Sequence, residues 1–151
     1  MAVRVQQEDF DAGQELATLA AQNHAIGGVV SFIGRVRDMT KDGELMAMTL
    51  EHYPGMTEHA LEKIEAEACS RWPLEASLIV HRHGRLEPGD QIVLVITASP
   101  HRHAAFEANQ FLVDWLKTKA PFWKMELTEQ GESWVETKSS DDRAAARWVA
   151  E

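Results

Sequence analysis

Residues 91–126 read QIVLVITASPHRHAAFEANQFLVDWLKTKAPFWKME and hold the strongest structural signals in the chain. The segment 91–99 is a nearly unbroken apolar run, which predicts a strand buried near the centre of a sheet. Residues 103–119 then predict a long amphipathic helix, because apolar side chains recur at helical spacing: Ala104, Ala108, Phe111, Leu112, Trp115 and Leu116. Phe106, Val113 and Lys117 lie on a different face, so we expect this helix to be contacted on two sides.

The other segments alternate between strand-like and helix-like patterns. We expect strands over 26–33, 45–53, 76–84, 122–128 and 133–137, and helices over 14–23, 57–71 and 140–148. Lys41-Asp42-Gly43 supplies turn residues and predicts a loop or hairpin tip. This mixture predicts an α+β fold with a largely antiparallel sheet.

Composition narrows the class of protein. A length of 151 residues, with 44% hydrophobic and 26% charged residues, is typical of one globular domain. Fifteen Lys and Arg against 24 Asp and Glu give a net charge of −9, so nucleic acids and anionic membranes are poor partners. The opening residues are too polar for a signal peptide, no run approaches a membrane span, and one cysteine excludes an internal disulfide; we therefore expect a cytoplasmic protein.

The basic residues gather where strands and helices end. Arg35 and Arg37 follow the strand expected at 26–33, and His101 and Arg102 follow the central strand. Lys117 and Lys124 flank Pro121 at the end of the long helix. The basic residues in these three places are Arg35, Arg37, His101, Arg102, Lys117 and Lys124. In so acidic a chain, this grouping predicts an anion pocket rather than a solvated surface. Arg102 also precedes a helix N-terminus, which favours phosphate or carboxylate.

Each of these positions has a simpler structural interpretation. Arg35 and Arg37 could serve only to solubilise a loop, and His101 and His103 could be capping or surface residues. Lys117 could be a surface lysine whose stem packs along apolar neighbours. Lys119 continues the apolar stripe at the helix end, where its charge complements the dipole, and is interpreted as structural.

Two His-X-His pairs, at 81/83 and 101/103, raise the question of a metal. Residues i and i+2 share a face of a strand, so such a pair could bind one ion. No carboxylate or cysteine stands at suitable spacing, and no glycine-rich phosphate-binding motif is present, so no metal and no cofactor are expected. A metal-dependent hydrolase that uses the histidines stays open as an alternative.

The strings HYPGMT at 52–57 and KTKAPFWK at 117–124 are long and unusual. With FIGRVRD at 32–38 they make residues 26–148 resemble the large, catalytic subunit of molybdopterin synthase. The resemblance implies an α/β hammerhead, which is an α+β fold with a largely antiparallel sheet and a small inserted β subdomain. It implies one domain over 1–151, with the subdomain at approximately 38–50 and 122–138.

The resemblance also implies partners and a reaction. Large subunits form a homodimer, and each binds one small ubiquitin-like sulfur-carrier subunit, which gives a heterotetramer. The carrier ends in a glycine thiocarboxylate and delivers sulfur to cyclic pyranopterin monophosphate. Two transfers make the molybdopterin dithiolene, so the implied activity is that of a sulfurtransferase in molybdenum cofactor biosynthesis.

By position, the family's substrate-binding residues fall on Arg35, Val36, Arg37, His101, Arg102, Lys117, Lys124, Met125 and Glu126. Lys117 and Lys124 match the two lysines regarded as catalytic. Position 35 is commonly Lys in the family and is Arg here, which keeps the charge but changes its shape. The alternative is a non-enzymatic adaptor that docks the tail of a ubiquitin-like partner.

Overall fold

The computed structural model describes residues 1–40, 43–135 and 139–149. Their elements, in chain order, are β1 (Ala2–Gln6), α1 (Ala12–Ala20), β2 (Gly28–Arg35), β3 (Met39–Thr40), β4 (Gly43–His52), α2 (Met56–Arg71), β5 (Ala76–Arg82), β6 (Gly84–Leu86), β7 (Gln91–Ser99), α3 (Arg102–Lys119), β8 (Phe122–Thr128), β9 (Gly131–Val135) and α4 (Ser139–Ala146). Lys41 and Asp42 of the expected loop lie outside the described residues.

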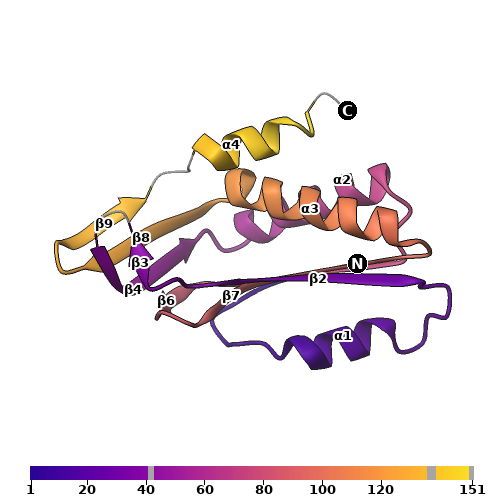
Figure 1. Cartoon of the computed structure of the whole chain (residues 1–151), viewed down its shortest axis with the longest axis horizontal. Helices are drawn as coiled ribbons and strands as arrows, with labels where there is room; N and C mark the ends of the chain where they lie inside the picture. Colours follow the sequence, from indigo (N-terminus) through magenta and orange to yellow (C-terminus); the bar gives the residue numbers. More distant parts are fainter. Residues whose placement is uncertain (41–42, 136–138, 150–151) are drawn as a thin grey trace.

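The first sheet is organised around β7. Its strand order is β1-β5-β7-β2, with β7 antiparallel to both neighbours and β1 parallel to β5. Helices α2 and α3 cover one face of this sheet and α1 covers the other (Figure 1). Val93 and Val95 pack with α2 and α3, while Leu94 and Ile96 pack with α1. The predicted central strand is therefore confirmed, and its unbroken apolar run is explained by burial on both faces.

The core between the sheet and α3 is built around Phe111, which is fully buried. Its ring contacts Trp115, Trp72 and Trp148, with centroids 4.6, 5.4 and 5.7 Å away. Trp148 follows α4, and its Nε1 donates to Oδ2 of the buried Asp114 at 2.7 Å. These contacts hold α4 against α3.

The second sheet has the order β3-β4-β8-β9, and β6 also pairs with β4. All of these pairs are antiparallel, and their apolar side chains form a separate cluster: Val36, Leu45, Met48, Leu50 and Leu86. Among the described strands, β1 and β5 form the parallel pair, and the other pairs are antiparallel. The predicted α+β fold with a largely antiparallel sheet is therefore confirmed. None of the described helices combines the length and hydropathy that crossing a bilayer requires.

Three local features differ from expectation. The polar opening of the chain was not expected to form a strand, yet β1 adds to β5 with Val3 and Val5 packed on the core. Helix α1 begins earlier than expected because the Asp11 side chain caps it by accepting from the Gln14 N–H at 3.1 Å. Phe106 was expected on a contacted face of α3 but is 61% exposed, and it lines an open hollow at the start of the helix.

The Phe111 cluster yields a stability prediction. Phe111→Ala should lower the free energy of unfolding by about 3–5 kcal/mol, because a buried aromatic is lost and a cavity remains. Phe106→Ala on the same helix is the matched control and should change it by less than about 0.5 kcal/mol. Urea unfolding followed by circular dichroism measures both. Equal effects of the two variants would contradict this view of the core.

Candidate functional site

A cavity of about 210 Å³ opens between the C-terminal end of α3, the end of β2 and the first residues of β8. Its apolar walls include Phe32, Val93, Val95, Val113, Leu116 and Phe122. Three cationic side chains reach it from three different elements, namely Arg35, Lys117 and Lys124. Three positive charges gathered at one hollow attract an anion, and Arg35 and Lys117 are also exposed to solvent.

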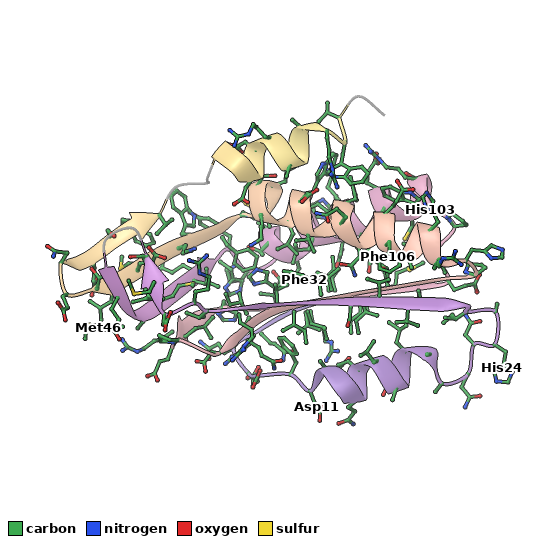
Figure 2. All side chains as sticks on the ribbon, in the orientation of Figure 1. Asp11, His24, Phe32, Met46, His103 and Phe106 are labelled. Atoms are coloured by element: carbon green, nitrogen blue, oxygen red, sulfur yellow. The ribbon has the colours of Figure 1, made fainter. Side chains whose placement is uncertain are left out.

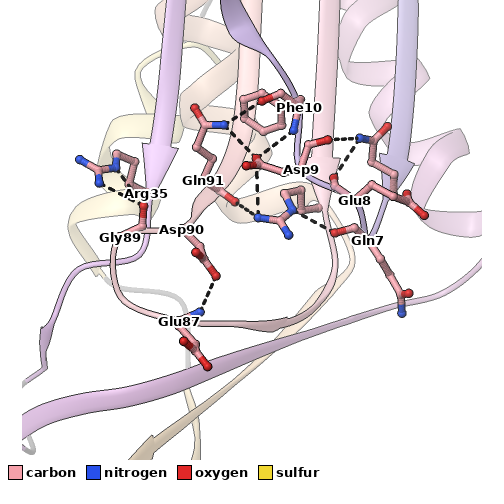
Figure 3. Close-up of polar contacts among 11 residues, drawn as sticks. Gln7, Glu8, Asp9, Phe10, Arg35, Glu87, Gly89, Asp90 and Gln91 are labelled. Carbon is pink, nitrogen blue, oxygen red and sulfur yellow. Dashed lines mark hydrogen bonds and ion pairs between the residues drawn. The ribbon is translucent and has the colours of Figure 1, made fainter.

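Arg35 is held at the cavity by the turn between β6 and β7. Its Nε and Nη2 donate to the carbonyl oxygen of Gly89 at 3.3 and 3.0 Å (Figure 3). Gly89 has φ +93°, which favours glycine, and the Asp90 carboxylate accepts from the Glu87 N–H at 2.8 Å to close the turn. The β2–β7 register shifts between Gly34 and Arg35, and such bulges re-aim side chains.

Lys117 and Lys124 flank the sharp connection from α3 to β8. Lys117 lies in the last turn of α3, where a positive charge complements the helix dipole. The hydroxyl of the buried Thr57 donates to the carbonyl of Pro121 at 3.1 Å and accepts from the Tyr53 N–H at 2.9 Å. The start of α2 therefore fixes the connection that positions both lysines, which gives the 52–57 string a structural role.

Lys124 faces the cavity because of the alternation along β8. It pairs with Leu50 of β4, and its Nζ lies 3.8 Å from Oε2 of Glu126, two residues further along the same face. Met125 lies on the opposite face of the strand. Glu126 thus contacts a cation of the site, whereas Met125 points away from it.

His81 is a further member of the site. It lines the cavity from β5, is 5% exposed, and its ring stacks on Phe122 with centroids 3.8 Å apart. Burial lowers the pKa of His81 to about 4, and the positive charge of Lys117 and the neighbouring His83 and His52 add to this effect. The imidazole is therefore neutral at neutral pH.

Val36 and Arg37 follow Arg35 but play different parts. Val36 is 3% exposed and belongs to the core of the second sheet. Its backbone N–H donates to the Asp90 carbonyl at 2.9 Å and its carbonyl accepts from the Gly89 N–H at 2.8 Å. Val36 therefore secures the turn that holds Arg35, while Arg37 is exposed beyond the end of β2.

His101 and Arg102 lie at the opposite end of the β2–β7 pair. They line a separate hollow with Gly27, Pro100, His103 and Phe106. Figure 2 shows His103 and Phe106 at this end of α3 and Met46, of the second sheet, at the other end of the molecule. Eight residues of β2 separate the two places, which corresponds to roughly 25 Å of strand. One chain brings Arg35, Lys117 and Lys124 together and does not bring His101 or Arg102 to them.

Sequence reasoning did not place His81 or Asp141 in the site, although they line the cavity from β5 and α4. His81 was considered only as half of a histidine pair. The ring of His83, its partner in that pair, contacts the His52 ring instead, with centroids 3.9 Å apart. The described residues include no group of three or more His, Cys, Asp or Glu arranged for a metal. The sequence feature that could have identified His81 is its position at the end of a buried apolar run, Leu78–Val80.

Comparisons with known proteins agree on one family. The model of the MoaE protein family matches residues 5–119. A molybdopterin synthase catalytic subunit of Pseudomonas aeruginosa is 60% identical over 148 residues, covering 98% of this chain and 99% of its own. The molybdopterin biosynthesis MoaE protein from Burkholderia ambifaria has a TM-score of 0.85, with 55% identity and full coverage of both chains. A chain in the complex of subunits 1 and 2 of molybdopterin-converting factor from Helicobacter pylori shares the fold, with a TM-score of 0.71, 22% identity, and coverage of 91% of this chain and 92% of its own.

The buried His81 yields a pH prediction. Its pKa is about 4 in the folded chain against 6.5 ordinarily, so the unfolded chain binds more protons between these values. Above pH 6.5 the neutral imidazole makes its full contribution to the free energy of unfolding. This contribution falls as the pH drops toward 4, by roughly 3 kcal/mol in total. His81→Asn should show a shallower fall over this window than the wild type.

Urea midpoints measured from pH 7 to pH 4 test this prediction. His24→Asn, at an exposed position, is the control and should follow the wild-type slope. Parallel slopes for His81→Asn and the wild type would show that the imidazole is not held neutral.

Proposed function

This chain belongs to the MoaE protein family, and we propose that it is the catalytic subunit of molybdopterin synthase. In this proposal it is a sulfurtransferase that moves sulfur from the thiocarboxylated C-terminus of a small ubiquitin-like carrier to cyclic pyranopterin monophosphate. The observation that carries the proposal is the single cavity shared by Arg35, Lys117 and Lys124. The names of the relatives and the two-subunit complex of the Helicobacter pylori factor support it.

The cavity suits the charges of this reaction. The substrate carries a cyclic phosphate, and the carrier tail ends in an anion. Arg35 offers a planar set of donors to phosphate, which an Arg fork binds with two hydrogen bonds. Lys117 is placed to stabilise the negative charge that develops on the carrier's terminal carbonyl, and Lys124 to assist proton transfer or anion binding.

Two observations indicate that one chain holds an incomplete site. About 210 Å³ is below the roughly 300–1,000 Å³ of complete small-molecule pockets. The remaining expected substrate-binding cations, His101 and Arg102, lie at the far end of β2. Another surface must therefore complete the cavity, and a second copy of this chain can supply it.

The edge strand β2 offers a way to build that dimer. It has one neighbour in the sheet, β7, and its Val29 and Ile33 are 39% and 37% exposed. Two-fold antiparallel pairing of β2 with its copy would set the Gly28 end of one strand beside the Arg35 end of the other. His101 and Arg102 of each protomer would then approach the Lys117 cavity of its partner. We therefore propose a homodimer with shared sites, and with two carriers a heterotetramer.

Replacement of Lys117 tests the reaction. Lys117→Ala should lower the rate of molybdopterin formation by about 10²–10³-fold, since it removes a donor placed to stabilise developing negative charge. Lys119→Ala is the matched control, because Lys119 lies on the same helix with its Nζ 5.1 Å from the centroid of the Trp115 ring. It should stay within about twofold of the wild type. The assay combines the chain, thiocarboxylated carrier and cyclic pyranopterin monophosphate.

Three outcomes of this assay separate the hypotheses. Near-normal product from folded Lys117→Ala would remove Lys117 from the mechanism. Tight carrier binding by the wild type without any turnover would favour the adaptor. Loss of wild-type activity on chelation would favour the metal-dependent alternative.

Complementation between variants tests the shared site. Lys117→Ala and Arg102→Ala should each be inactive as homodimers. Once subunits exchange, the mixed dimer contains one site with both residues intact, so activity should recover to roughly a quarter of the wild type. A monomer in sedimentation, or mixtures that stay inactive after exchange, would contradict a site built from two copies.

A further inference from the structure

The proposed sulfur transfer creates a need for a proton acceptor. When the thiocarboxylate sulfur displaces an oxygen substituent from a substrate carbon, that oxygen leaves with the bonding pair, and the sulfur joins the carrier's acyl carbon to the pterin as a thioester. Sulfur stays on the pterin only if the acyl C–S bond then breaks. Water oxygen bonds to the acyl carbon, the sulfur leaves with the bonding pair as a thiolate, and the water gives up one proton. The carrier departs as a carboxylic acid, which ionises.

The cations of the cavity are poorly suited to take that proton. An ammonium or guanidinium group donates hydrogen bonds and has no lone pair to offer. Arg35, Lys117 and Lys124 can therefore bind anions, and a protonated lysine can donate a proton, but a different group must accept the proton that the water loses. We infer that His81, through its Nε2, is the general base that activates this water, an inference that rests on the proposed function.

The hydrogen bond of His81 fixes which nitrogen is available. Nδ1 lies 2.8 Å from the carbonyl oxygen of Arg82, and a carbonyl can only accept, so Nδ1 carries the hydrogen. Nε2 of the neutral ring then holds the lone pair. The stack on Phe122, tilted by 18°, keeps the ring in this orientation.

The contacts of His81 place the lone pair of Nε2 toward the cavity by elimination. Across the described residues, no fully buried polar side-chain atom lacks a hydrogen-bond partner. The hydrogen bond of the His81 ring is the one that Nδ1 makes, so Nε2 must be reached by solvent. His81 as a whole is 5% exposed and lines the cavity, which is the space open to that atom.

The surrounding charges set the base strength of His81. Arg35 from β2, Lys117 from α3, Lys124 from β8 and Asp141 from α4 line the same cavity, and His52 and His83 lie near the ring. Burial, with a smaller contribution from the positive charge of Lys117, keeps the imidazole neutral, so its lone pair is available. Bound phosphate and the carrier terminus bring negative charge, which raises the pKa of the imidazole toward the working pH and makes it a better base.

His81→Asn tests the inference. Asparagine can still donate to the Arg82 carbonyl but cannot accept a proton. The turnover number should fall by about 10²–10⁴-fold, with carrier affinity within about threefold of the wild type. In a single turnover, intact-mass spectrometry should show the carrier joined to the pterin by the unhydrolysed thioester.

His83→Asn is the matched control, because His83 lies two residues away and stacks with His52 rather than lining the cavity. Its turnover should stay within about twofold of the wild type. As a second variant, His81→Ala should regain turnover when imidazole is added, a response that a purely structural role would not give.

The outcomes separate this inference from the proposed function. A wild-type chain that transfers no sulfur overturns both. A wild-type chain that transfers sulfur, together with a His81→Asn variant of normal turnover, overturns the role of His81 alone. Loss of turnover without the thioester, and without imidazole rescue of His81→Ala, also overturns it.

Discussion

Burial of β7 on both faces is the constraint on which the rest of the structure depends. A strand with Val93 to Ser99 all buried needs a cover on each side, and α3 provides one of them directly after the strand ends. Because α3 must run back along the sheet to cover it, its last turn arrives above the end of β2. The position of Lys117 beside Arg35 is thus a consequence of covering an apolar strand.

The second sheet completes the cavity because the connection from α3 is short. Ala120 and Pro121 separate the helix from β8, and Thr57 holds the Pro121 carbonyl. With so little chain between them, Lys117 and Lys124 can approach the same space from a helix and from a strand. The apolar walls come from both sheets, so the site lies where the two cores meet.

Local patterns predicted the elements better than they predicted which cations would meet. The apolar run and the helical stripe identified β7 and α3, and the grouping of basic residues identified Arg35, Lys117 and Lys124. His101 and Arg102 were expected beside them because they too follow a strand. However, β2 and β7 are antiparallel, so the residues that follow the two strands lie at opposite ends of the sheet. Strand direction depends on the whole topology, which periodicity does not encode.

The neutral imidazole of His81 lies in a cavity lined by cations, so the binding of anions there changes its base strength. Burial is the main reason that the ring is neutral, and the positive charge of Lys117 adds to it, but both also make the imidazole a weak base. Anionic ligands reverse that balance, because each negative charge beside the ring stabilises its protonated form. Under the proposed function, phosphate and the carrier terminus would bring negative charge beside His81 only on binding. Its base strength would then rise only with the reactants in place, so the electrostatics of the cavity would favour hydrolysis after binding.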